Sequence, residues 1–202
     1  MLKIWGRKNS VNVQKVLWIA DEFGLAYERI DAGREFGVVD SPQYRRMNPN
    51  GVVPTIDDDG FVLWESNAIV RYLWLKHGPP VTPRAFAESD RWMDWFATTF
   101  WAAIRPVFWG LTRTPPAERN MDEIEAARKK TAALLETVDE ALIGRPYLAG
   151  DDFGMGDIPM GCAVWRWFGL DIERPRYANL EAWFARLSER PAYRRNVLQP
   201  LT

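Results

Sequence analysis

Hydrophobic and polar positions follow two patterns along the chain, and the first occupies residues 1–78. Short apolar runs bounded by polar or glycine residues predict strands. They are Leu2–Trp5, Tyr27–Ile30, Thr55–Ile56 and Phe61–Trp64. Helical spacing appears between them, at Val13, Val16, Leu17 and Ala20, near Gln43–Arg46, and from Glu65 towards His77. The order strand, helix, strand, helix, strand, strand, helix predicts an α/β domain with a mixed four-stranded sheet.

The second pattern follows a predicted linker at 79–86, which is rich in proline. No strand pattern occurs after it. An aromatic helix is expected over 85–105, with Pro106 bending or ending it. The strongest helical period runs from Ile124 to Leu142, and further helices are expected over 155–168 and around 180–187, the last one stopped by Pro191. Residues 87–202 are therefore predicted to form an all-α helical-bundle domain.

Charge and composition exclude several classes of partner. The formal net charge is −1, so the chain offers no basic field for nucleic acid and no polybasic stripe for a membrane. No apolar run approaches the ~20 residues of a membrane span, and the first residues do not read as a signal peptide. We therefore expect a cytoplasmic protein. A single cysteine, Cys162, and a single histidine, His77, argue against a disulfide and a metal site.

One sequence segment combines two features that suit a peptide ligand. In Asn48-Pro49-Asn50-Gly51-Val52-Val53-Pro54, the proline favours an extended Val53. A cis bond between Val53 and Pro54 would turn the backbone N–H and C=O of Val53 outward, where an extended peptide can pair with them. Glu65 and Ser66 then open a helix whose free N–H groups and dipole favour a carboxylate.

The order and spacing of these segments resemble the thioredoxin-like domain of the cytosolic glutathione transferases, of bacterial type, and the resemblance covers essentially the whole chain. A second match is the segment 147–158, in which Gly154 stands at the cap position of a buried helix and Asp157 can reach back to its free N–H groups. The resemblance implies glutathione as co-substrate. It also implies a homodimer formed through the third helix and the long aromatic helix, with Arg71 and Trp74 as contacts.

The resemblance also suggests which residues handle glutathione. Ser10 is our first candidate for the hydrogen bond to the sulfur and Asn12 the second, which would make this a serine-type active site. Either residue could instead merely cap the first helix. No tyrosine or cysteine stands in this loop. Val53, Pro54, Glu65, Ser66 and Asn50 are carried over as glutathione-binding residues, and Lys8 is a weaker candidate for the glycyl carboxylate.

A cleft for the second substrate is expected along the first helix of the helical domain. The candidates are Trp101, Arg105, Phe108 and Trp109. The alternative for the three aromatic residues is a place in the core or at a dimer contact, and Arg105 could serve only to compensate the helix dipole. Asp157 is expected to be a folding residue, Cys162 a small buried hydrophobe and His77 an exposed residue at a helix end.

These expectations favour a detoxifying transferase that activates the thiol of glutathione for attack on a small apolar electrophile. Other glutathione-dependent reactions in the same pocket stay open: reduction of disulfides or peroxides, isomerisation and dehalogenation. A non-enzymatic, transferase-like binding module is the alternative from another class.

Overall fold

The computed structural model describes all 202 residues, and they form two compact units. The first unit contains residues 1–81 and 191–199, and the second contains residues 82–190 and 200–202. The division predicted from the sequence differs at its C-terminal end, because the last helix packs with the first unit. No helix combines the length and the apolar character needed to cross a bilayer.

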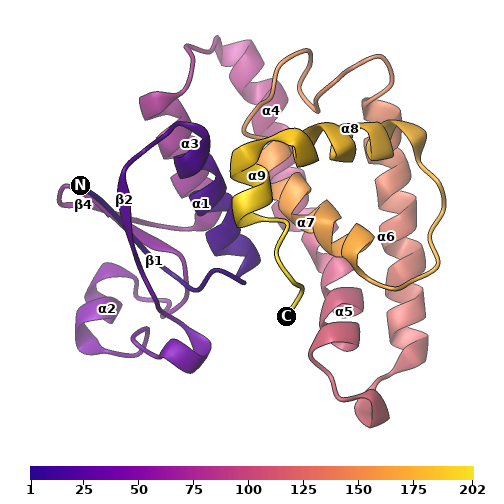
Figure 1. Ribbon diagram of the computed structural model, residues 1–202, viewed down its shortest axis with the longest axis horizontal. Coiled ribbons are helices and arrows are strands. Elements are labelled where there is room, and N and C mark those ends of the chain that lie inside the picture. Colours follow the sequence, from indigo (N-terminus) through magenta and orange to yellow (C-terminus); the bar gives the residue numbers. More distant parts are fainter. The chain divides into compact units, whose positions relative to one another are not determined.

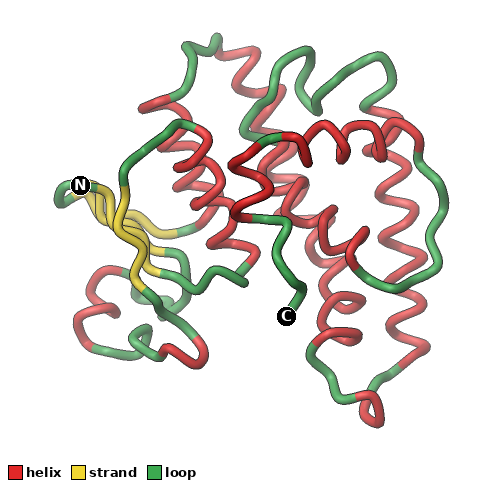
Figure 2. The backbone as a smooth tube through the Cα atoms, viewed as in Figure 1, coloured by secondary structure: helices red, strands yellow, loops and turns green.

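The first unit holds every strand of the chain (Figures 1 and 2). Its elements are β1 (Leu2–Trp5), α1 (Val11–Glu22), β2 (Tyr27–Ile30), α2 (Pro42–Met47), β3 (Thr55–Asp58), β4 (Phe61–Trp64), α3 (Ser66–His77) and α9 (Pro191–Asn196). The sheet has the order β2-β1-β3-β4, with β1 and β2 parallel and the other pairs antiparallel. The predicted mixed four-stranded sheet is confirmed.

The strand register gathers three loops at one end of this sheet. Trp5, the last residue of β1, pairs with Thr55, the first residue of β3. Thr55 also pairs with Trp64, the last residue of β4. The loop that follows β1, the loop that precedes β3 and the start of α3 therefore leave the sheet at the same end. Residues far apart in the sequence can act together there.

The helices of the first unit include one that the sequence analysis missed. α1 packs against α3, and α9 packs against α1 (Figure 1). The ring of Tyr193 lies 4.6 Å from that of Trp18, and Asn196 donates to the carbonyl of Leu17. Pro191 follows the end of α8 at Glu189, as predicted, and it also begins α9, which was not predicted. Proline is favoured at the first helical position, because its missing N–H would have no partner there anyway.

The second unit is all-helical, as predicted. Its elements are α4 (Pro83–Trp95), a π-helical turn (Phe96–Phe100), α5 (Trp101–Thr112), α6 (Met121–Ala141), α7 (Asp157–Gly169) and α8 (Ala178–Glu189). α4 already begins within the expected linker, because Thr82 caps it and Pro83 takes its first position. Pro106 does not end the aromatic helix, which continues to Thr112. The buried neighbours Ile104, Val107 and Phe108 anchor α5 around it.

α7 is the most deeply buried helix of this unit, and its start is closed by Asp157. The Asp157 carboxylate accepts from the N–H of Gly154 at 2.8 Å, as predicted, and also from the N–H of Leu148 at 3.1 Å. A third bond comes from Nε1 of Trp183 at 2.8 Å. Asp157 is fully buried, so this is a folding residue. Cys162 is buried in the same helix and His77 is exposed, as expected.

Candidate active site

The first candidate, Ser10, stands at the start of α1 without capping it. Ser10 has the extended backbone of an N-cap residue (φ −81°, ψ 124°), yet its side chain makes no cap hydrogen bond. Ser41, Thr82 and Asn120 occupy the same position at α2, α4 and α6. Each of these accepts a bond at 3.2 Å from the backbone N–H three residues on. The hydroxyl of Ser10 is therefore not committed to its own helix, which removes the main structural alternative for this residue.

The segment before β3 presents the backbone of Val53. The Val53–Pro54 peptide is cis, the condition on which the predicted pairing depended. Neither the N–H nor the C=O of Val53 is paired within the chain. Pro54 itself is buried. The two backbone groups that an extended peptide would need are thus unsatisfied at the end of the sheet where Ser10 follows β1.

A buried polar network holds this segment in place. Tyr44 donates to the carbonyl of Val52 at 2.7 Å and lies 2.8 Å from the hydroxyl of Thr55. The side-chain amide of Asn48 donates to the same carbonyl at 2.9 Å and to the hydroxyl of Thr55 at 3.1 Å. Burial raises the pKa of Tyr44, so its hydroxyl remains a donor throughout the neutral range. The sequence analysis assigned no role to Tyr44 or Thr55, because their contacts with Val52 exist only once α2 and β3 have packed.

The start of α3 is open in a similar way. Glu65 is exposed, has a positive φ of 72° and makes no side-chain cap bond. A non-glycine residue in such a conformation is strained, and strain of this kind concentrates at functional sites. Ser66 follows as the first helical residue and is only 5% exposed. The side chain of Glu65 thus leaves the N–H groups of this first turn uncapped, as the prediction of a carboxylate site requires.

Lys15 lies directly beneath this helix start and was missed by the sequence analysis. It belongs to α1 and is only 2% exposed. Its Nζ lies 3.2 Å from Oγ of Ser66 and 3.2 Å from Oδ1 of Asn67. The one sequence signal was a lysine in a helix whose other residues are mostly apolar. The sequence pattern does not say which helix packs against Lys15, so its contact with the start of α3 could not be predicted.

Asn12 and Asn50 are the two remaining residues predicted to act on glutathione. Asn12 is half-buried in the first turn of α1. The side-chain amide of Asn50 is exposed and donates to Oδ1 of Asn48 at 3.2 Å, so it is used within its own turn. Their roles towards glutathione stay predictions.

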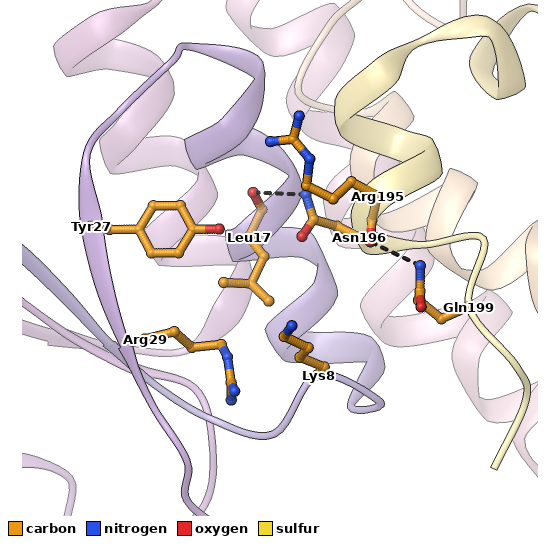
Figure 3. A pocket seen from close by; sticks show the side chains of 7 residues that line it. All are labelled: Lys8, Leu17, Tyr27, Arg29, Arg195, Asn196 and Gln199. Carbon is orange, nitrogen blue, oxygen red and sulfur yellow. Dashed lines mark hydrogen bonds between the residues drawn. The ribbon is translucent and has the colours of Figure 1, made fainter.

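Lys8 lines a different pocket of the first unit, of about 250 Å³ (Figure 3). The lining residues are Lys8, Leu17, Tyr27, Arg29, Arg195, Asn196 and Gln199. The ends of Lys8 and Tyr27 point into it, and burial with help from Asp21 raises the pKa of Tyr27 to about 12. Arg29 is paired with Asp31 and Arg195 with Asp21, and the charge of Lys8 also acts on Asp31. A contact of Lys8 with the glycyl carboxylate stays a prediction.

The four candidates for the second substrate separate into buried and exposed residues. Phe108 is 1% exposed and packs in a core cluster with Val107, Ile124 and Leu170, so the core alternative holds for it. Trp101 is half-buried. Arg105 and Trp109 line a pocket of about 290 Å³ at the α5 and α6 ends of the second unit, and the Arg105 guanidinium lies 5.2 Å from the Trp109 ring. Trp74, expected at a dimer contact, is buried edge-on against Phe23.

Comparison with known proteins identifies the family. Residues 1–74 match the family model "Glutathione S-transferase, N-terminal domain", and residues 92–191 match "Glutathione S-transferase, C-terminal domain". The chain is 42% identical to glutathione S-transferase GstB of Escherichia coli strain K12, with all of both chains covered. It is 28% identical to glutathione S-transferase 3 of Zea mays, with 97% of this chain and 93% of the relative covered.

A solved structure is similar to this chain over the whole fold. The theta class glutathione S-transferase of Xanthomonas axonopodis pv. citri, crystallised with glutathione bound, is 52% identical and superposes with a TM-score of 0.96. The match covers 100% of this chain and 99% of that one. The chain therefore belongs to the glutathione S-transferase family and is a glutathione transferase.

Proposed function

We propose that this enzyme is a serine-type glutathione transferase in which Ser10 donates a hydrogen bond to the sulfur of glutathione, its co-substrate. The backbone of Val53 pairs with the cysteinyl part of glutathione, while Glu65 and Ser66 hold the γ-glutamyl part. Asn12 assists Ser10. The bound thiolate then attacks a small apolar electrophile.

The observation that carries this proposal is the uncommitted hydroxyl of Ser10. It is the one Ser, Thr or Asn residue at a helix N-cap that does not bond its own helix. The open backbone of Val53 and the open start of α3 leave the sheet at the same end, by the register of Trp5, Thr55 and Trp64. The Ser10 hydroxyl, the Val53 backbone and the start of α3 thus match the thiol, the backbone and a carboxylate of glutathione.

The chemistry follows from this arrangement. A free thiol titrates near pH 8.5, and a hydrogen bond together with a helix N-terminus favours the thiolate, which is the nucleophile. Each unit by which the pKa falls corresponds to about 1.4 kcal/mol. Holding glutathione beside its electrophile also removes much of the entropic barrier of a bimolecular step. The single cysteine of the chain, Cys162, is buried in α7 and takes no part.

The test is a pH titration of bound glutathione, followed through the ultraviolet absorbance of the thiolate. The wild-type enzyme should show the thiolate at least one pH unit below free glutathione. Ser10→Ala should lose that shift and Asn12→Ala should reduce it, because Ser10 is the main donor. If Asn12→Ala alone abolishes the shift, the donor is Asn12. Saturable binding with no shift in the wild type would contradict thiol activation and favour a binding module.

Two finer features belong to the same proposal. Arg105 and Trp109 are our candidates for contacts with the electrophile, since both are exposed and line one pocket. The working form is a cytoplasmic homodimer with a role in detoxification. Phe61 and Trp64 on the edge strand β4 and Leu75 on α3 are exposed apolar side chains that a second copy could cover. Light scattering on the purified enzyme tests the dimer directly.

A further inference from the structure

Lys15 is an unusual residue for its position. It is a lysine with 2% of its surface exposed, and its Nζ lies against the N-terminal turn of α3. α1 and α3 lie side by side, so Lys15 reaches this turn from the neighbouring helix (Figure 1). Lysines are rarely buried, and a cation at a helix N-terminus faces the positive end of the helix dipole. Nζ is held there by Oγ of Ser66 and Oδ1 of Asn67, so the charge of Lys15 is placed at the start of α3.

The hydrogen bond from Lys15 determines what Ser66 can do. A serine hydroxyl has one donor hydrogen and two acceptor lone pairs. Nζ of Lys15 can only donate, so Oγ of Ser66 is the acceptor in their 3.2 Å contact. The hydrogen of Ser66 must therefore point elsewhere and is free to donate to a ligand. Accepting a bond from a cation also polarises the hydroxyl and makes it a stronger donor.

The second contact of Lys15 fixes the same turn more firmly. Nζ also lies 3.2 Å from Oδ1 of Asn67, so one side chain bridges the first two residues of α3. The strained residue Glu65 comes directly before them. Lys15 thereby orients Ser66 and adds positive charge where the helix dipole is also positive. A carboxylate oxygen bound to Oγ of Ser66, about 2.7 Å from it, would be attracted by both.

We propose that Lys15 is a positioning residue that holds Ser66 as a hydrogen-bond donor and supplies positive charge for the α-carboxylate of the γ-glutamyl group. This inference rests on the proposed function, because it takes Ser66 as a contact of that group. Lys15 does not touch the reacting sulfur. Its loss should therefore weaken the affinity for glutathione and raise KM, with a much smaller effect on kcat at saturation.

The experiment compares Lys15→Met with the wild type on three ligands, using calorimetry. The ligands are glutathione, 4-aminobutanoyl-cysteinyl-glycine, which lacks only the α-carboxylate, and glutaryl-cysteinyl-glycine, which lacks only the α-amino group. Lys15→Met should weaken binding of the two carboxylate ligands by about 10- to 100-fold, the range expected when one of two opposite charges a few ångströms apart near a protein surface is removed. Binding of the ligand without the carboxylate should change less than about 2-fold.

A matched control is Lys76→Met, at the other end of the same helix. Lys76 is bonded to Asp58, so the variant also loses a lysine contact, but far from the proposed carboxylate. It should leave all three affinities unchanged. Lys15→Gln keeps an N–H donor without the charge, and it gives the same three-ligand comparison if Lys15→Met does not fold.

The possible outcomes distinguish a failure of the role of Lys15 from a failure of the proposed function. If the wild type does not bind glutathione, the proposed function fails. If the wild type binds but Lys15→Met or Lys15→Gln weakens all three ligands equally, Lys15 has only a structural role and the inference is wrong. An unchanged affinity for every ligand would overturn it as well.

Discussion

The starts of α3 and α7 are two helix N-termini that the chain treats in opposite ways. At α7, the carboxylate of Asp157 accepts three hydrogen bonds, from Gly154, Leu148 and Trp183, and the chain closes its own helix. At α3, the preceding Glu65 makes no cap bond and turns outward. A lysine rather than a carboxylate lies beneath it, with Nζ bonded to Ser66 and Asn67.

This difference distinguishes a helix start that stabilises the fold, at α7, from one that binds a ligand, at α3. Both helix starts have unpaired N–H groups and a positive dipole end, which favour a negative partner. α7 takes that partner from its own sequence, so nothing is left for a ligand. At α3 the residue before the helix supplies no cap bond and a buried lysine adds positive charge, so this helix start suits a negatively charged ligand. Changes at the first site should therefore affect stability, and changes at the second should affect ligand binding.

The largest effect should come from opening the start of α7. Asp157→Ala leaves three buried N–H donors without an acceptor, and each buried donor left unsatisfied costs about 1–3 kcal/mol. We expect the free energy of unfolding to fall by about 3 kcal/mol or more, measured by urea denaturation followed by tryptophan fluorescence. Asp152→Ala, an exposed aspartate in the preceding loop, is the control and should change it by less than about 0.5 kcal/mol. Equal losses in both variants would contradict the closed-cap interpretation.

The next effect concerns catalysis at the start of α1. Ser10→Ala should lower kcat/KM by roughly 100-fold, or about 3 kcal/mol, which is typical when one preorganised donor to a developing anion is removed. The measurement uses saturating glutathione and a small aromatic halide as electrophile. Ser10→Thr retains the hydroxyl and should recover part of the activity. A Ser10→Ala variant with wild-type activity would exclude this residue as the sulfur donor.

A smaller effect is the pH dependence that Asp157 imposes on stability. Burial raises its pKa to about 6 in the folded state, above its ordinary value. Because the folded protein holds this proton more tightly, the group stabilises the fold fully at low pH, and that contribution is lost as the pH rises towards 6. The free energy of unfolding of the wild type, relative to Asp157→Asn, should fall by about 2 kcal/mol between pH 4.5 and 7. A constant difference would show that Asp157 has no raised pKa.

The sequence predicted what local patterns and family spacing determine. The strands, most helices, the cap by Asp157 and the outward-facing backbone of Val53 follow from residues within a few positions of one another. Lys15, Tyr44 and Thr55 were missed because their contacts join elements that are far apart in sequence. For Phe108 the sequence left both the cleft and the core open, because the helical period of α5 does not say which face is buried. Pro191 was correctly expected to stop α8, but the new helix that it begins was missed, because a proline fits both positions.

The smallest expected effect tests whether the side chain of Ser10 leaves α1 uncapped in solution. It compares Ser10 with Ser41, two serines of the first unit. Ser41 caps α2 by accepting from the N–H of Tyr44 at 3.2 Å, whereas Ser10 occupies the same position of α1 without such a bond. Ser41→Ala should lower the free energy of unfolding by about 1 kcal/mol, the usual value of an N-cap. Ser10→Ala should lower it by less than about 0.5 kcal/mol, because no cap bond is lost. Urea denaturation of the two ligand-free variants gives both values. If Ser10→Ala lowers the free energy of unfolding as much as Ser41→Ala does, the Ser10 hydroxyl caps α1 in solution. It would then not be reserved for the sulfur of glutathione.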